Sequence, residues 1–105
     1  MKKEVYVYLH SHWDREWYKS FERFRHRLIE VIEDVFKKLD NCEIDSFYLD
    51  GQVAAILDYL EIYPEKEVYV KKLIKNKKLY IGPFYVLADE YVVSGISLIR
   101  NLYYG

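Results

Sequence analysis

The fold is decided by the stretch EVYVYLHSHWDREWY at residues 4–18. Its first part, Glu4–Leu9, consists mostly of aromatic and β-branched residues, which are typical of a buried β-strand. Side chains alternate between the two faces of a strand, so His10, His12 and Asp14 point the same way if the extended conformation continues. Imidazole nitrogen and carboxylate oxygen are good ligands for a divalent metal such as zinc. The stretch therefore predicts a first strand that leads into a metal site.

Two interpretations of these side chains stay open. A His-x-His pair alone is more often two satisfied structural histidines than a metal site, whereas His-x-His-x-Asp directly after an apolar strand is more specific. The aromatic rings of Trp13 and Trp17 are suited to stacking on a sugar, but buried tryptophans are usually part of the core. A metal-dependent enzyme site and a purely structural motif are the two alternatives.

Two acidic residues follow the other strands that the sequence predicts. Asp50 comes directly after the run Ser46–Leu49, and Asp89 follows the run Leu79–Ala88. The ends of successive parallel strands meet at one edge of a sheet, where α/β folds build their active sites. We therefore expect both acids at the same edge as the first motif. The alternatives are a turn residue for Asp50, since a glycine follows it, and a helix cap or a loop acid for Asp89.

Helical patterns separate these strands. Helices are expected over residues 20–39, from residue 53 to before Pro64, over residues 65–75, and after a capping Ser94. Strands that alternate with helices imply a parallel sheet with right-handed crossovers. The predicted fold class is therefore α/β, with three consecutive βα units. Three such units leave sheet edges and helix faces uncovered, so we expect the chain to need a partner or a second copy.

Composition excludes several classes of function. The chain has 105 residues, one domain at most, with 16 basic and 17 acidic residues, which argues against binding to nucleic acid. Cys42 is its single cysteine, so no intrachain disulfide forms, as in a reducing compartment. The N-terminus shows no signal-peptide pattern, and no stretch approaches the ~20 apolar residues of a membrane span. We expect a cytoplasmic protein that binds no membrane.

The motifs together resemble glycoside hydrolase family 38, the zinc-dependent α-mannosidases, and especially its bacterial and archaeal branch. The resemblance begins at His10–Tyr18 and continues in order over residues 24–28, 49–52, 57–62 with 64–65, 81–86, 89–90, and 94–95 with 97–102. It implies that residues 1–105 form the N-terminal portion of the family's catalytic domain. It also implies that the three βα units are the first part of a distorted (β/α) barrel.

The resemblance implies roles for individual residues. His12 and Asp14 would be zinc ligands, and Asp89 would be both a zinc ligand and the catalytic nucleophile. His10 matches a position that is not a ligand in the family. The substrate-binding residues would be Trp13, Trp17 and Asp50. A nucleophilic carboxylate must stay ionised, and a neighbouring dication favours that state.

Two parts of the family's machinery are expected outside this chain: one further histidine ligand of the zinc, and the general acid/base. We therefore expect retaining hydrolysis of terminal α-mannosides by the whole enzyme, and an N-terminal fragment that is inactive alone. Expected partners are an α-mannoside or another mannose-containing glycan, and the downstream part of the enzyme or a second copy of the chain. The alternatives are a non-catalytic remnant that binds metal or sugar, and a domain like the metal-dependent carbohydrate deacetylases.

Overall fold

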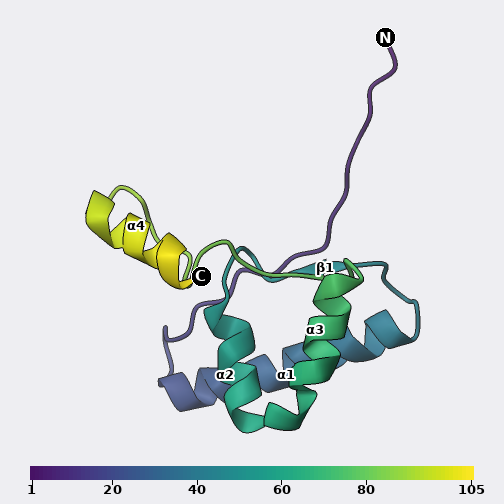
Figure 1. The fold of residues 1–105 in the computed structure, drawn as a ribbon, viewed down its shortest axis with the longest axis horizontal. Coiled ribbons are helices and arrows are strands. Elements are labelled where there is room, and N and C mark those ends of the chain that lie inside the picture. Colours follow the sequence, from purple (N-terminus) through teal and green to yellow (C-terminus); the bar gives the residue numbers. More distant parts are fainter.

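The structure is a computed structural model that describes residues 1–105, and it has an α/β architecture. Its elements are α1 (Phe21–Asp40), β1 (Phe47–Tyr48), α2 (Ala54–Ile62), the 3-10 helix η1 (Pro64–Lys66), α3 (Glu67–Lys75), β2 (Leu79–Tyr80) and α4 (Gly95–Tyr104). The strands β1 and β2 form a two-stranded parallel sheet, in which Phe47 pairs with Leu79 and Tyr48 with Tyr80. Helices α1, α2 and α3 pack on one side of this sheet, whereas α4 stands apart (Figure 1).

The core lies where α1 meets α2, α3 and the sheet. Helix α1 presents one face of buried residues at helical spacing: Phe24, Leu28, Ile32, Val35, Phe36 and Leu39. Tyr59 of α2 is fully buried against this face, with its ring 5.5 Å from that of Phe36. Its hydroxyl donates to Glu33, so this hydrogen bond and the burial raise the pKa of Tyr59. The predicted first helix is confirmed to within one residue at each end.

After β1, the predicted stop of the next helix before Pro64 and the predicted end of α3 at Lys75 are confirmed, whereas α3 starts at Glu67, two residues later than predicted. Helix α2 ends at Ile62, ahead of Pro64, and Pro64 opens η1, where the missing backbone N–H costs nothing. Ser94 caps α4, because its Oγ accepts a hydrogen bond from the Ser97 backbone N–H at 3.3 Å. None of the helices combines the length and the apolar character that a membrane span requires.

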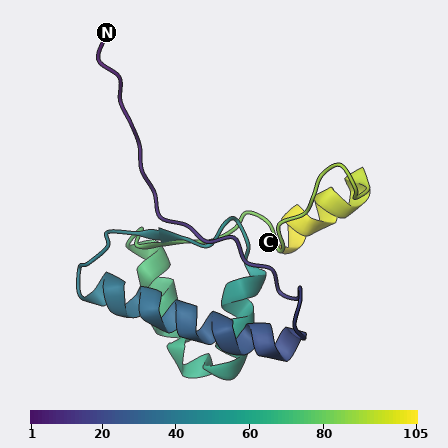
Figure 2. The ribbon, with the colours of Figure 1, turned by 180° about the vertical axis from the view of Figure 1, so that it is seen from behind.

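The prediction of a buried first strand over Glu4–Leu9 is wrong. These residues are exposed and lie outside any strand, and in both ribbon views they extend away from the helices (Figures 1 and 2). The segment's only backbone pairing with the sheet is a parallel bridge between His10 and Tyr48, next to which the Tyr8 ring lies edge-on to that of Tyr48, with centroids 6.2 Å apart. A strand is stabilised by its hydrogen-bond ladder and by burial of its faces. Beyond this bridge the segment has neither, because β1 is two residues long and no helix covers residues 4–8.

The third predicted strand is shorter than the run that suggested it. Regular pairing covers Leu79–Tyr80, and the chain then bends at Gly82, whose φ of +64° is unlike that of a strand. Phe84 returns as an isolated parallel bridge with Gln52. The α/β class and the parallel pairing are thus confirmed, but the sheet has two strands in place of three. The complete βα units and the barrel are not seen in this chain.

Candidate functional site

The sequence motif at residues 10–18 crosses the end of the sheet as an irregular segment. It starts at the His10–Tyr48 bridge, where the Tyr48 N–H donates to the Leu9 carbonyl at 2.9 Å. Trp13 then packs edge-on against Phe24 of α1, with ring centroids 6.0 Å apart. The motif is therefore held between the sheet and the first turns of α1.

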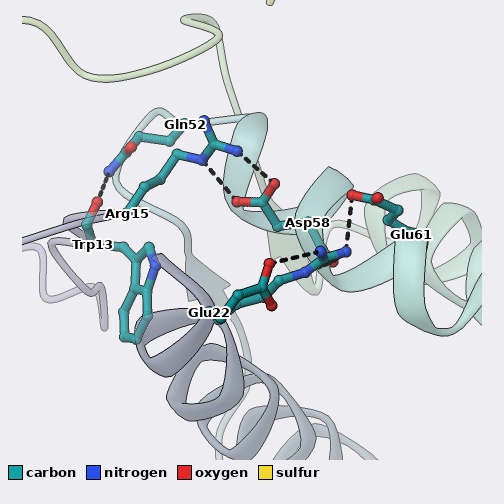
Figure 3. A network of polar contacts seen from close by, with 7 residues as sticks. Trp13, Arg15, Glu22, Gln52, Asp58 and Glu61 are labelled. Carbon is teal, nitrogen blue, oxygen red and sulfur yellow. Dashed lines mark hydrogen bonds and ion pairs between the residues drawn. The ribbon is translucent and has the colours of Figure 1, made fainter. Parts of the chain in front are cut away.

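An ion pair in the middle of the motif fixes it to α2 (Figure 3). Arg15 donates through Nε to Asp58 Oδ2 at 2.7 Å and through Nη2 to Oδ1 at 2.8 Å. The Asp58 side chain is only 9% exposed, and its hydrogen bond to Arg15 raises the pKa of that guanidinium. Arg25 of α1 donates to the Asp58 carbonyl at 3.2 Å and pairs with Glu61 at 2.8 Å. Bidentate geometry of this kind gives both strength and a fixed orientation.

A second contact ties the motif to the turn after β1. The buried Gln52 donates through Nε2 to the Trp13 carbonyl at 2.9 Å (Figure 3). Sequence reasoning found neither this contact nor the Arg15–Asp58 pair. For Asp58 a signal existed: it lies three and four residues after the buried Ala55 and Ala54, so the helical period places it on the inward face of α2.

The Asp50 side chain faces both histidines of the motif. Its Oδ2 is 2.7 Å from His12 Nδ1, and its Oδ1 is 3.5 Å from His10 Nδ1. The hydrogen bond that His12 donates to Asp50 is the main reason that the pKa of His12 is raised. Asp50 is also part of a turn with Gly51, and both have positive φ, +46° and +73°. It is thus a turn residue whose side chain joins the first motif, so the two interpretations of it are compatible.

His12 also faces Asp14, which is a second expected zinc ligand. The distance from His12 Nε2 to Asp14 Oδ1 is 3.4 Å, and both side chains are more than half exposed. One imidazole nitrogen and one carboxylate oxygen that converge in this way fit the donor chemistry of zinc. The pair is incomplete, because no group of three or more His, Cys, Asp or Glu side chains is arranged to hold a metal ion.

The remaining predicted site residues lie apart from this pair. Asp89 is exposed and starts the turn before α4, where its Oδ1 accepts a hydrogen bond from the Tyr91 N–H at 3.0 Å. It makes no ion pair with His12. Of the two expected sugar-stacking residues, Trp13 packs against the core and Trp17 is 75% exposed. The sheet edge therefore gathers His12, Asp14 and Asp50, and Asp89 lies outside that group.

The polar side chains of this α/β chain gather at the end of a parallel sheet, where folds of this class carry their sites. The family is shown by comparison: residues 2–105 match the model described as the N-terminal domain of glycosyl hydrolases family 38. The chain belongs to that family and corresponds to the N-terminal part of its catalytic domain.

Individual relatives agree. A protein of Halalkalibacterium halodurans named "Putative mannosylglycerate hydrolase" is 44% identical over an alignment of 106 positions, which covers 100% of this chain and 12% of that protein. The crystal structure of an α-mannosidase from Enterococcus faecalis V583 is similar with a TM-score of 0.88 and 48% identity, over 96% of this chain and 12% of that one. A second family 38 structure from Enterococcus faecalis has a TM-score of 0.81 and 43% identity, over 92% and 11%. The chain thus spans about an eighth of the length of these relatives.

Proposed function

We propose that this chain is part of an α-mannosidase that hydrolyses terminal α-mannosides with retention of configuration. The observation that carries the proposal is the likeness to the α-mannosidase from Enterococcus faecalis, at 48% identity over 96% of the chain. The convergence of His12 and Asp14 at the sheet edge supports it, because it places metal-binding chemistry at the position where such folds carry their sites.

We infer that His12 and Asp14 hold a zinc ion, with Asp89 as a third ligand and a histidine from outside the chain as a fourth. The donor types suit zinc, and the open faces of both side chains leave room for further ligands. A bound zinc would orient the sugar through the sugar's hydroxyl groups and would offset the negative charge of the nucleophilic carboxylate. Asp89 makes no contact with the pair here, so the rest of the enzyme has to hold residues 86–93 against the motif.

The proposed chemistry uses Asp89 as nucleophile. Its carboxylate oxygen forms a bond to the anomeric carbon while the bond from that carbon to the aglycone oxygen breaks, and the leaving oxygen takes a proton from the general acid. Water then attacks the same carbon and gives a proton to the deprotonated general acid, which now acts as base; the bond to Asp89 breaks, mannose is released and the free carboxylate returns. The general acid/base is assigned to the part of the enzyme outside this chain. Trp17 is exposed and is the better placed of the two tryptophans to stack on the sugar.

The relative from Halalkalibacterium halodurans suggests one particular substrate. Its name denotes hydrolysis of mannosylglycerate, in which mannose is linked to a small acid. We include this compound among the candidate α-mannosides. Comparing its hydrolysis with that of a neutral aryl α-mannoside decides between an acidic and a neutral aglycone.

The test joins this chain to the part that it lacks. The chain replaces the matching segment of the Enterococcus faecalis α-mannosidase, and hydrolysis of an aryl α-mannoside is measured beside the unaltered enzyme. We expect the hybrid to be active and Asp89→Ala to lower its turnover by more than about a thousandfold. Glu90→Gln, which removes the neighbouring exposed acid, is the control and should keep most of the activity.

Two outcomes would count against the proposal. Turnover that survives Asp89→Ala would show that the nucleophile is another residue. A hybrid that folds and binds zinc but never hydrolyses the mannoside would favour the alternative of a metal- or sugar-binding remnant.

A further inference from the structure

We propose that Asp50 is a positioning residue for His12: its carboxylate holds the imidazole in the tautomer that leaves Nε2 free to bind a metal. This inference rests on the proposed function, because it concerns the same metal site. It gives Asp50 a role different from the substrate-binding role that the sequence predicts.

The first step is the chemistry of the hydrogen bond. The distance of 2.7 Å between His12 Nδ1 and Asp50 Oδ2 is that of a short, charge-assisted contact. An ionised carboxylate can only accept, so Nδ1 must carry the proton. In a neutral imidazole the other nitrogen then holds a lone pair. That nitrogen, Nε2, is the atom that faces Asp14 at 3.4 Å.

The second step is that Asp50 is the more buried partner, held at the end of β1, and His12 the more exposed one. Asp50 follows β1 directly: the Leu49 N–H donates to the Tyr80 carbonyl, and the Gln52 N–H donates to the Leu49 carbonyl, both at 2.9 Å. The Asp50 side chain is 18% exposed, whereas that of His12 is 58% exposed. The sheet therefore sets the place of the carboxylate, and the carboxylate sets the orientation of the ring.

The third step excludes the simplest alternative, that Asp50 only stabilises its own turn. A turn aspartate normally accepts a hydrogen bond from a backbone N–H nearby. The Asp50 carboxylate accepts from no backbone group, and its two oxygens face His12 and His10. The contact with His10, at 3.5 Å, is longer than an ordinary hydrogen bond. Both oxygens are thus directed at the motif, and His12 is the stronger contact.

A carboxylate behind a metal-binding histidine has a known physical effect. It fixes the tautomer and the ring orientation and makes the ligand nitrogen more basic. Removal of such a partner typically costs 10–100-fold in metal affinity. Asp50, His12 and Asp14 have the arrangement that this effect requires. The Asp50 carboxylate lies at Nδ1 of the ring, and Asp14, a further candidate metal ligand, lies at Nε2.

The experiment uses the full chain and two variants that tolerate the backbone of position 50. Asn and Gly both adopt positive φ readily, so Asp50→Asn and Asp50→Gly keep the turn while they remove the carboxylate. Asp45→Asn is the matched control, because Asp45 is an exposed acid in the loop before β1 and makes no ion pair. The first readout is the tautomer of His12 in the metal-free chain, from nitrogen-15 NMR at a pH where the ring is neutral. The second is the affinity for zinc alone, by calorimetric titration.

We expect His12 in the wild type to carry its proton on Nδ1. In Asp50→Gly the proton should move mainly to Nε2, as in a solvated histidine side chain without a partner, and zinc affinity should fall about 10- to 100-fold. Asp50→Asn should have a smaller effect, since its amide oxygen can still accept from the ring. Asp45→Asn should change neither readout.

The inference is overturned if His12 carries its proton on Nε2 in the wild type, or if Asp50→Gly changes neither the tautomer nor the zinc affinity. An equal loss of affinity in Asp45→Asn would also overturn it, because the effect would then be one of net charge. Failure of the proposed function looks different: the tautomer responds to Asp50 as expected, but neither the wild-type chain nor its hybrid with the rest of the Enterococcus faecalis enzyme binds zinc. In that case the positioning contact stands and the metal site does not.

Discussion

The middle of the chain and its two ends are built from similar residues but differ in burial. Helices α1 to α3 and the sheet share a cluster of 12 buried apolar residues. Helix α4 has no buried residue. Ile96, Ile99 and Tyr103 form an apolar face on it, but all three are exposed. Residues 1–9 are exposed throughout. An apolar helical period thus specifies a helix in both regions, whereas burial depends on what packs against it.

The residues of the candidate site also belong partly to the packed middle of the chain and partly to its unpacked end. His12 and Asp50 are held by contacts with the packed middle, and Asp89 lies in the turn that leads to the unpacked α4. A site that needs all of them can be only partly formed by this chain. This comparison yields four predictions on stability, given from the largest effect to the smallest.

The largest effect is expected for a residue at the centre of the core. Leu28 is 1% exposed, so Leu28→Ala should lower the free energy of unfolding by about 3 kcal/mol. Ile99 in α4 is 64% exposed, and Ile99→Ala should change it by less than about 0.5 kcal/mol. Urea denaturation of both variants measures the difference. Equal losses would mean that α4 is packed in solution and that the two regions do not differ.

The ion pair that anchors the motif should rank second. Asp58→Ala leaves the Arg15 guanidinium without its partner. We expect the free energy of unfolding to fall by about 2–3 kcal/mol, a loss that the partial exposure of the arginine limits. Glu61→Gln is the comparison, because Glu61 also pairs with an arginine but its side chain is 70% exposed. It should cost less than about 1 kcal/mol. If Asp58→Ala were as mild as Glu61→Gln, the motif would not depend on this anchor.

A third, smaller effect should appear at alkaline pH in the packed region. Burial and a hydrogen bond to Asp40 raise the pKa of Tyr69 to about 12, above its ordinary value of 10.0. The folded chain keeps this proton where the unfolded chain loses it, so the stabilisation is complete below about pH 10 and is lost as the pH rises towards 12. Solvent screening should keep it below about 1 kcal/mol. Tyr69→Phe should flatten the fall of stability with pH over this interval, and an unchanged slope would rule out the linkage.

The smallest effect is expected at the N-terminus. Val5 and Val7 are 82% and 85% exposed, so replacing both with Thr should change the free energy of unfolding by less than about 0.5 kcal/mol. The amides of residues 4–8 should exchange with solvent far faster than those of α1. Slow exchange, or a loss above about 1 kcal/mol, would show that this segment is paired in solution, as the sequence predicts.

The sequence predicted what is local and missed what depends on distant partners. The ends of α1, the stop before Pro64 and the Ser94 cap follow from residues within a few positions, and the structure confirms them. The strand at residues 4–9 was wrong, because pairing and burial need neighbours that composition does not reveal. Asp50 does meet His12 at one edge of the sheet, as their positions at strand ends predict, although 38 residues separate them. The Arg15–Asp58 pair could not be predicted in this way, since only residues at strand ends were considered.

The central claim is that the packed middle of this chain preforms two donors of a zinc site, His12 and Asp14. The most direct test is a zinc titration of the purified chain beside a His12→Ala/Asp14→Ala double variant. We predict saturable binding of about one zinc per chain in the wild type and its loss in the double variant. Binding of equal strength in both proteins, or none in the wild type, would contradict the claim.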